Sequence, residues 1–307
     1  MNLTFPENFK EHYSELTDWN KFSKILGTPL RKSIRINTLK ADVKEVIKKL
    51  ELDWNLTPIP WIKEGFFIED KKGERKDIGN IEGHDEGLFY IQEAVSMIPA
   101  LVLDPKPGKH ILDMCASPGS KTTQIAQMMQ NQGQIVAADI RDDRIAILKR
   151  NISRLGVTNC EIVKKSGQQF KDVLFDRILV DAPCSGTGTM RLQEEIDKWN
   201  PVVSKRLSFE QKSLLHSAYC VLKKGGILVY STCSLEPEEN EAVIDWLLKR
   251  HKKTALEEIK IEGLKSTNPI LEHKGNKFDK SISNCLRLWP QDNNTSGFFI
   301  AKIRKMK

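Results

Sequence analysis

Two cysteines follow apolar runs in segments that are polar and turn-forming. Cys184 belongs to DAPCSGTG after the run DRILV, and Cys233 belongs to STCS after GILVY. The thiolate is the nucleophilic form of cysteine, and polar strand ends favour it more than an apolar core does. These two residues are therefore candidates for chemistry. The other four cysteines are interpreted by default as inert, small hydrophobic side chains. They are Cys115, Cys160, Cys220 and Cys285.

A small-residue loop and an acid indicate a nucleoside site. The strand-like run HILDM is followed by CASPGSKTTQIA, a loop that lets backbone pass close to a ligand and aims helix N–H groups at its charge. The loop lacks G-x-G-x-x-G, and its GSKT differs from the G-K-[ST] ending of a phosphate-binding loop. Asp139 ends the next strand-like run, where it can accept hydrogen bonds from ribose hydroxyls; a plain helix N-cap is the alternative.

Apolar runs that alternate with amphipathic segments must position these residues. The runs HILDMC, QIVAADI, NCEIVK, DRILVDAP and GILVYSTC are separated by helical patterns such as DDRIAILKRNISRLG. This alternation predicts an α/β fold, a mostly parallel sheet with helices on both faces and an antiparallel final strand at residues 298–303. A helix is expected from about residue 85 to residue 103. Ligands of such sheets bind beyond the carboxyl ends of the strands, so the expected site comprises residues 113–121, 139, 166, 181–188 and 231–234.

A different pattern precedes this sheet. Residues 33–39 alternate like a strand, residues 43–50 have the apolar spacing of one helix face, and short strand-like pieces follow at residues 59–68. We therefore expect a small α+β module over residues 1–83 and a larger α/β domain over residues 84–307.

The composition fits an intracellular protein with a polyanionic partner. With 307 residues and 39% apolar content the chain can bury a core, and its formal charge of +7 suits a nucleic acid, although many basic proteins never bind one. The cysteines show no C-x-x-C pair or zinc-type spacing, so we expect neither a disulfide framework nor a metal site. The first residues lack the apolar core of a signal peptide, and no apolar run approaches ~18 residues. A soluble, cytoplasmic monomer is expected.

Together these motifs resemble the Sun/Nop-type RNA cytosine-5 methyltransferases, from about residue 90 to residue 303. The resemblance lies in YIQEAVSMIPALVLDP, DMCASPGSKTTQIA, the acid Asp139, DAPCSGTG, STCS and SGFFIAKI, and DAPC with a downstream TCS is very specific. IRINTLK, at residues 34–40, is similar to the start of that family's small RNA-binding module. The resemblance implies a Rossmann-like methyltransferase fold, S-adenosylmethionine as methyl donor and a cytosine in structured RNA as acceptor.

The same resemblance assigns roles to site residues. The loop would cradle the methionine end of the cofactor, Asp139 would hold its ribose, and Asp181 would lie between the cofactor and the target base. Arg144 is a candidate for the cofactor side, with a solvated helix residue as the alternative. Where the family has an acid for the adenine amino group, this chain has Ser166, which can still accept a hydrogen bond; Gln168 or a backbone carbonyl is the alternative. The loop residues concerned are Cys115, Ala116, Ser117, Pro118, Gly119, Ser120 and Lys121.

Cytosine chemistry explains why such an enzyme needs two thiols and an acid. Carbon 5 becomes nucleophilic only after a thiolate adds to carbon 6, and its remaining proton must leave as the thiol is eliminated. An acidic group at N3 eases the addition, and Asp181 is the candidate. Chemistry alone leaves the roles of the thiols open. The family resemblance assigns attack to Cys233 and release to Cys184, whereas DNA cytosine methyltransferases use the cysteine of a Pro-Cys motif.

We expect tRNA rather than ribosomal RNA as the substrate, because the compact chain resembles the small archaeal members of the family. Basic segments, among them KILGTPLRKSIR, are candidate phosphate contacts. Four alternatives stay open: a ribosomal RNA substrate, a DNA substrate, an amino-group methyltransferase, which would not need Cys233, and a non-catalytic RNA-binding protein on the same fold. The N-terminal module and the order of the motifs favour RNA over DNA.

Overall fold

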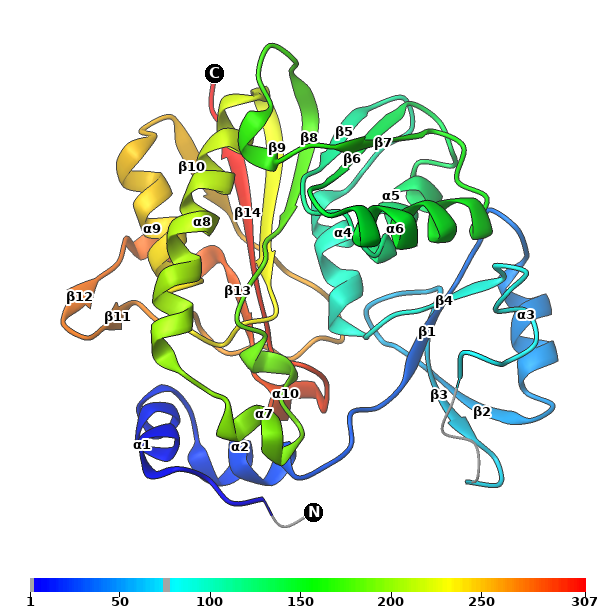
Figure 1. Ribbon diagram of the computed structural model, residues 1–307, viewed down its shortest axis with the longest axis horizontal. Helices are drawn as coiled ribbons and strands as arrows, with labels where there is room; N and C mark the ends of the chain where they lie inside the picture. Colours follow the sequence, from blue (N-terminus) through cyan, green and yellow to red (C-terminus); the bar gives the residue numbers. More distant parts are fainter. Residues whose placement is uncertain (1–2, 74–77) are drawn as a thin grey trace.

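The computed structural model describes residues 3–73 and 78–307 and contains a large mixed β-sheet and a small antiparallel one (Figure 1). The large sheet has eight strands and runs through the middle of the molecule. The small sheet lies at one end of the molecule, together with helix α3 (Val43–Leu50).

The large sheet is mostly parallel. Its strands are β5 (His110–Asp113), β6 (Gln134–Asp139), β7 (Cys160–Lys164), β8 (Phe175–Asp181), β9 (Leu222–Thr232), β10 (Thr254–Glu257), β13 (Leu286–Leu288) and β14 (Phe298–Lys305). The parallel part has the order β7-β6-β5-β8-β9, so the direction in which strands are added reverses between β5 and β8. Beyond β9, β14 runs antiparallel and pairs with β10 and β13. The fold class expected from the sequence is confirmed.

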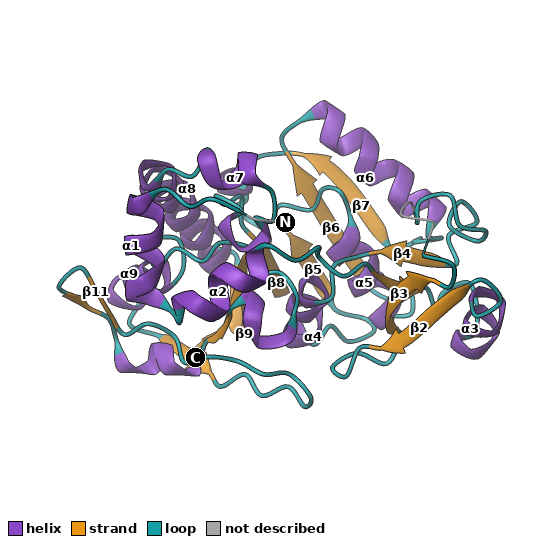
Figure 2. Ribbon diagram, turned by 90° about the horizontal axis from the view of Figure 1, so that it is seen from below, coloured by secondary structure: helices purple, strands orange, loops and turns teal. Residues whose placement is uncertain are grey.

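Helices cover both faces of this sheet because its strands are apolar on both faces (Figures 1 and 2). Neighbouring residues of one strand, such as Ile111 and Leu112 of β5, belong to two different apolar cores, as the twofold repeat of a strand requires. One core contains residues of α4 (Ile98–Leu103), α5 (Ser120–Met128) and α6 (Asp142–Arg154). The other contains residues of α8 (Pro201–Cys220) and α9 (Glu241–Arg250).

The small sheet consists of β1 (Ser33–Ile36), β2 (Trp54–Pro58), β3 (Gly65–Asp70) and β4 (Phe89–Ile91), in the order β2-β3-β1-β4. The helix expected over residues 85–103 was wrong in its first half. Residues 89–91 form β4, which pairs with β1, and α4 begins only after the short helix η1 (Val95–Met97). The aromatic and β-branched run FYI favours a strand where a partner strand is at hand. The small sheet therefore extends beyond residue 83, where the sequence suggested that the module ends.

The first two helices, α1 (Glu7–Leu16) and α2 (Trp19–Leu26), pack against the large-sheet part of the molecule rather than on the small sheet (Figure 1). They lie near α7 (Gln193–Asp197) and α10 (Pro290–Asn293). Their aromatic side chains form one buried core with residues from far along the chain. That core comprises Phe9, Tyr13, Phe22, Leu26, Met190, Ile196, Leu235 and Trp289.

A buried arginine joins the small sheet to the large-sheet part. Arg35 of β1 donates from Nη1 to the carbonyl of Ser120 at 2.8 Å and from Nη2 to Oγ1 of Thr123 at 2.9 Å, both in α5. Burial lowers the pKa of Arg35 to about 9. Because a buried guanidinium needs acceptors for its donors, these two contacts hold β1 against the first turn of α5.

The remaining short elements are η2 (Gly167–Gln169), η3 (Thr187–Thr189), β11 (Glu272–His273), β12 (Asn276–Lys277) and η4 (Lys280–Asn284). Within the described residues, no helix combines the length and the apolar character that a membrane crossing needs.

Candidate active site

A cavity of about 400 Å³ lies beyond the carboxyl ends of β5, β6 and β8, where the strand order reverses. Open α/β sheets bind ligands at this place, and small-molecule sites typically measure roughly 300–1,000 Å³. The structure brings together both candidate thiols and the candidate nucleoside-binding acid. Of the residues to which the sequence assigns a role, those that line the cavity are Cys115, Ser117, Asp139, Arg144, Ser166, Asp181, Cys184 and Cys233; Met114, Ala182 and Pro183 of the expected ranges line it as well.

The loop between β5 and α5 reaches the cavity with only part of its residues. Gly119 turns the chain into α5 with a φ of 103°, a conformation that favours glycine. A Cβ at this position would lie 2.9 Å from Cδ1 of Leu148, so the glycine also lets the loop pack closely on α6. The predicted loop residues that do not line the cavity are Ala116, Pro118, Gly119, Ser120 and Lys121.

Asp139 places a buried carboxylate at the end of β6. Its Oδ1 accepts the backbone N–H of Ile140 at 2.8 Å, and its Oδ2 lies 3.1 Å from Nε of Arg144. Arg144 also donates from Nη2 to the carbonyl of Ser117 at 2.7 Å. Arg144 therefore ties the acid to the loop, although part of its side chain faces solvent.

Apolar side chains complete the cavity on the side of Asp139. Ile140 is 58% exposed and lines the cavity together with Leu214 and Pro183. Ser166 also lines it, and its hydroxyl accepts the backbone N–H of Gln168 at 3.4 Å as the cap of η2. Ile140 was not predicted to be a site residue. Its position directly after Asp139, at the end of a strand, is the sequence feature that could have indicated it. An acid flanked by apolar surface suits a nucleoside, which combines a polar ribose with a flat base.

Asp181, at the end of β8, is held by two partners. Nζ of Lys121 donates to its Oδ2 at 2.7 Å, and Oγ of Ser231 donates to its Oδ1 at 2.7 Å. Lys121 is only 7% exposed and also donates to Oγ of Ser96 at 2.9 Å. Burial has the largest single effect and would lower the pKa of Lys121, but Asp181, together with Cys233 and Asp113, raises it overall. Lys121 is thus a buried cation beside Asp181, a position that the resemblance did not assign to it.

The two candidate thiols touch each other. Sγ of Cys184, in the loop after β8, lies 3.3 Å from Sγ of Cys233, directly after β9. The hydrogen bond from Cys184 lowers the pKa of Cys233; burial and Asp181 oppose this effect, and the charge of Lys121 adds to it. The same hydrogen bond, burial and the nearby Glu239 raise the pKa of Cys184 well above its usual range. These opposite shifts favour the proton on Cys184, with Cys233 as the thiol that ionises more easily.

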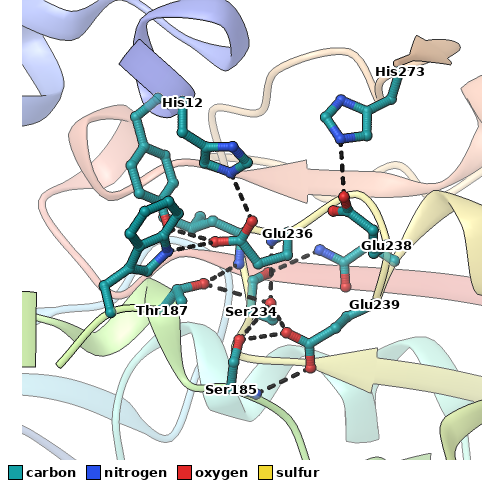
Figure 3. Close-up of polar contacts among 12 residues, drawn as sticks. His12, Ser185, Thr187, Ser234, Glu236, Glu238, Glu239 and His273 are labelled. Carbon is teal, nitrogen blue, oxygen red and sulfur yellow. Dashed lines mark hydrogen bonds and ion pairs between the residues drawn. The ribbon is translucent and has the colours of Figure 1, made fainter. Parts of the chain in front are cut away.

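The acidic run after Cys233, LEPEENE at residues 235–241, was not predicted to be part of the site. A run of acids usually indicates a solvated face. Here each glutamate binds a different element: Glu236 binds α1, Glu238 binds the β11–β12 hairpin, Glu239 binds the loop after β8, and Glu241 binds β13. Figure 3 shows the first three of these contacts. The run therefore connects the segment that follows Cys233 to four other elements, and the glutamate bound to the loop that carries Cys184 is Glu239.

Two protein-family models match the chain. The model described as 16S rRNA methyltransferase RsmB/F matches residues 100–304, and the model described as the N-terminal domain of 16S rRNA methyltransferase RsmF matches residues 5–94. Among similar proteins, the tRNA (cytosine(49)-C(5))-methyltransferase of Pyrococcus abyssi is 45% identical, and the match covers 99% of each chain. Ribosomal RNA small subunit methyltransferase F of Shigella dysenteriae is 39% identical over 98% of this chain, which spans 63% of that protein.

Two solved structures share the fold over nearly the whole chain. A methyltransferase homologue from Pyrococcus horikoshii is 41% identical, with a TM-score of 0.82, and the match covers 94% of this chain and 90% of that one. NSun6 from Pyrococcus horikoshii, solved with SFG, an S-adenosylmethionine analogue, is 26% identical, with a TM-score of 0.84 over 99% of both chains. The likeness therefore includes the small sheet as well as the large one.

Proposed function

We propose that this chain, which belongs to the 16S rRNA methyltransferase RsmB/F family, methylates a cytosine of tRNA through a covalent bond to Cys233. Methyl transfer from S-adenosylmethionine to carbon 5 of an RNA cytosine is the activity of the family. The observation that carries the covalent mechanism is the 3.3 Å contact between the Cys184 and Cys233 thiols, beside the Asp181–Lys121 ion pair.

The proposed mechanism gives the two thiols different roles. Cys233, whose pKa is the lowered one of the pair, would form the bond to carbon 6 of the cytosine. Cys184 would then assist the removal of the carbon 5 proton while the bond between Cys233 and carbon 6 breaks. The reaction releases one proton overall, so Cys184 passes its own proton to solvent before it accepts the proton of carbon 5.

Asp181 would face the Watson–Crick edge of the cytosine. Lys121 and Ser231 fix both of its oxygens, so an entering base would meet a preoriented acceptor for its amino group or for a protonated N3. Lys121 compensates the charge of this carboxylate without occupying all of its lone pairs.

The cavity fits S-adenosylmethionine, which when bound supplies an electrophilic methyl group. Asp139 would accept hydrogen bonds from the ribose hydroxyls, and Ile140 would pack against the adenine. The loop that contains Cys115 and Ser117 would hold the methionine end. Ser166 would offer the adenine amino group a lone pair of the hydroxyl that caps η2.

The similarity to the tRNA methyltransferase of Pyrococcus abyssi favours tRNA, because its identity of 45% exceeds the 39% of the Shigella ribosomal RNA methyltransferase. The target cytosine must leave its stack to reach the thiols. Residues 1–83, with β4 added, would supply the RNA-binding module, and Arg31 and Lys32 are its candidate phosphate contacts. Ribosomal RNA is the second candidate, favoured by the description of the matching family.

Methyl transfer to defined RNAs tests this function. The purified protein, methyl-labelled S-adenosylmethionine and either tRNA or 16S ribosomal RNA are incubated, and bisulfite sequencing locates the product. We expect 5-methylcytosine in tRNA and none with Cys233→Ala. Label in ribosomal RNA alone would favour the second substrate, and full methylation by Cys233→Ala would contradict the covalent mechanism.

A further inference from the structure

The carboxylate of Glu239 connects the two segments that carry the thiols. Its Oε2 accepts the backbone N–H of Ser185 at 3.0 Å, and its Oε1 accepts hydrogen bonds from Oγ of Ser185 and, at 2.7 Å, from Oγ of Ser234. Ser185 directly follows Cys184, and Ser234 directly follows Cys233. Figure 3 shows the Glu239 side chain reaching between the two serines, whose hydroxyls lie 3.1 Å apart.

We propose that Glu239 is a positioning residue that holds the Cys184 and Cys233 thiols in contact by clamping the serines that follow them. This inference rests on the proposed function, in which both thiols act on the cytosine. Glu239 lies beyond the thiols and does not line the cavity, so it acts through its neighbours.

A third element completes the clamp. Nε2 of Gln211, in α8, donates to Oε2 of Glu239 at 2.8 Å and to the carbonyl of Pro183 at 2.9 Å. Pro183 directly precedes Cys184, so the backbone is held on both sides of this cysteine. Glu239 and Gln211 are fully buried. Four donors around one buried carboxylate offset its desolvation, and they leave it little freedom to move.

The backbone contacts between the two segments are compatible with this role. The N–H of Gly188 donates to the carbonyl of Cys233 at 2.8 Å, and a Cβ on Gly188 would lie 2.8 Å from that same oxygen. The N–H of Leu235 donates to Oγ1 of Thr187 at 2.8 Å. These bonds bring the main chains together, while Glu239 holds the residues next to the sulfur atoms.

The charge of Glu239 also supports the different roles of the thiols, with Cys233 as the nucleophile and Cys184 as the group that assists release. Its carboxylate is one of the groups that raise the pKa of Cys184, after the hydrogen bond to Cys233 and burial. The hydrogen bond with Cys184 lowers the pKa of Cys233, and the charge of Lys121 adds to this effect against burial and Asp181. The two shifts together favour the proton on Cys184.

Two variants break the clamp in different ways, and a neighbouring glutamate provides the control. Glu239→Ala removes the carboxylate, and the double variant Ser185→Ala with Ser234→Ala removes the two hydroxyl donors but keeps the charge. Glu238→Gln removes the adjacent ion pair with His273 and Lys274, which lies outside the clamp. Burial raises the pKa of Glu238, but the hydrogen bonds from His273 and Lys274 outweigh it and lower the pKa to about 2. Glu238→Gln therefore removes a favourable contact without changing any hydrogen bond of the clamp.

Two quantities are measured for each full-length variant. The first is kcat for RNA methylation, with the KM for RNA. The second is the effective concentration of the two thiols, obtained from the fraction of Cys184–Cys233 disulfide at equilibrium in a glutathione buffer, in which oxidised glutathione is reduced as the disulfide forms. Mass spectrometry identifies the linked peptides, and the disulfide reading does not depend on activity.

We expect Glu239→Ala to lower kcat by about 100-fold with little change in the KM for RNA, and to lower the thiol effective concentration by at least about tenfold. The double serine variant should change both quantities in the same direction, and Glu238→Gln neither. If the clamp variants only lose thermal stability, with both quantities unchanged, Glu239 has no positioning role. If the effective concentration falls while Cys233→Ala still methylates RNA, the proposed function fails and the positioning role stands.

Discussion

The Sγ atoms of Cys184 and Cys233 lie 3.3 Å apart, although 49 positions separate the two cysteines in the sequence. The contact between them lowers the pKa of Cys233, against burial and Asp181, whereas the same contact, burial and Glu239 raise the pKa of Cys184. The proton is therefore favoured on Cys184, and a covalent cycle requires one thiol to attack and the other to assist release.

Substitution of each cysteine should separate the two steps. Cys233→Ala has no nucleophile, so it should give neither methylated RNA nor a crosslink to RNA. Cys184→Ala should accumulate a protein–RNA adduct that survives denaturing electrophoresis, because attack and methyl transfer proceed while release stalls. The double variant should give no adduct. If Cys233→Ala is instead the variant that traps RNA, the roles of the thiols are reversed.

The hydrogen bond between the thiols should be visible in their reactivity. Cys184→Ala removes the hydrogen-bond partner that lowers the pKa of Cys233, so the Cys233 pKa should rise and the pH midpoint of its alkylation by iodoacetamide should move up. Peptide mass spectrometry follows Cys233 alone, and Cys220→Ala, which changes an exposed thiol on α8, is the control. An unchanged or lower midpoint in Cys184→Ala would show that Cys184 does not stabilise the Cys233 thiolate.

Asp139 should contribute to cofactor affinity. Asp139→Ala removes a charged acceptor for ribose hydroxyls, which we expect to weaken S-adenosylmethionine binding by about 1.5 to 3 kcal/mol in calorimetry. Asp143→Ala, which removes an exposed carboxylate paired with Arg141 in the same segment, is the matched control and should bind normally. Equal affinities of the two variants would remove Asp139 from the site.

Lys32 should contribute to RNA binding through its charge. It is exposed, and together with Arg31 it lines a cavity of about 710 Å³ beside β1 and β4. Lys32→Glu should weaken RNA binding at low salt and make the slope of log affinity against log salt shallower by about one unit. Cofactor affinity should not change. An unchanged salt slope would exclude Lys32 from the RNA contacts.

Deletion of residues 1–83 is a poor test of the RNA-binding module, because α1 and α2 belong to a different core. Their aromatic residues cover Met190, Leu235 and Trp289, and Oη of Tyr13 donates to Glu236 at 2.5 Å. Their removal would expose apolar side chains and leave the Glu236 carboxylate buried without this donor. If such a truncation lost RNA binding, the loss could result from unfolding of the large-sheet part as well as from removal of RNA contacts.

The sequence predicted the parts of the site that follow directly from a strand. Cys184, Cys233, Asp181 and Asp139 all lie at or just after strand ends, and parallel strands bring their carboxyl ends to one edge of the sheet. The strand β4 was not predicted, because its three residues form a strand only through pairing with β1. The clamp around Glu239 was not predicted either, since its partners lie 5 to 54 positions away and local pattern carries no information about such contacts.

The packing of α1 and α2 also determines when the fold can be completed. Nε2 of Gln291 donates to Oγ1 of Thr17 at 2.8 Å across 274 positions, and the ring of Trp289 lies 5.7 Å from that of Phe22. At about 5–20 residues per second, a ribosome needs roughly 15–55 s to make the chain between them. During that interval the aromatic faces of the first two helices have not met these partners. A polypeptide released before residue 289 would keep those faces exposed. We therefore expect truncated products to aggregate and to bind chaperones.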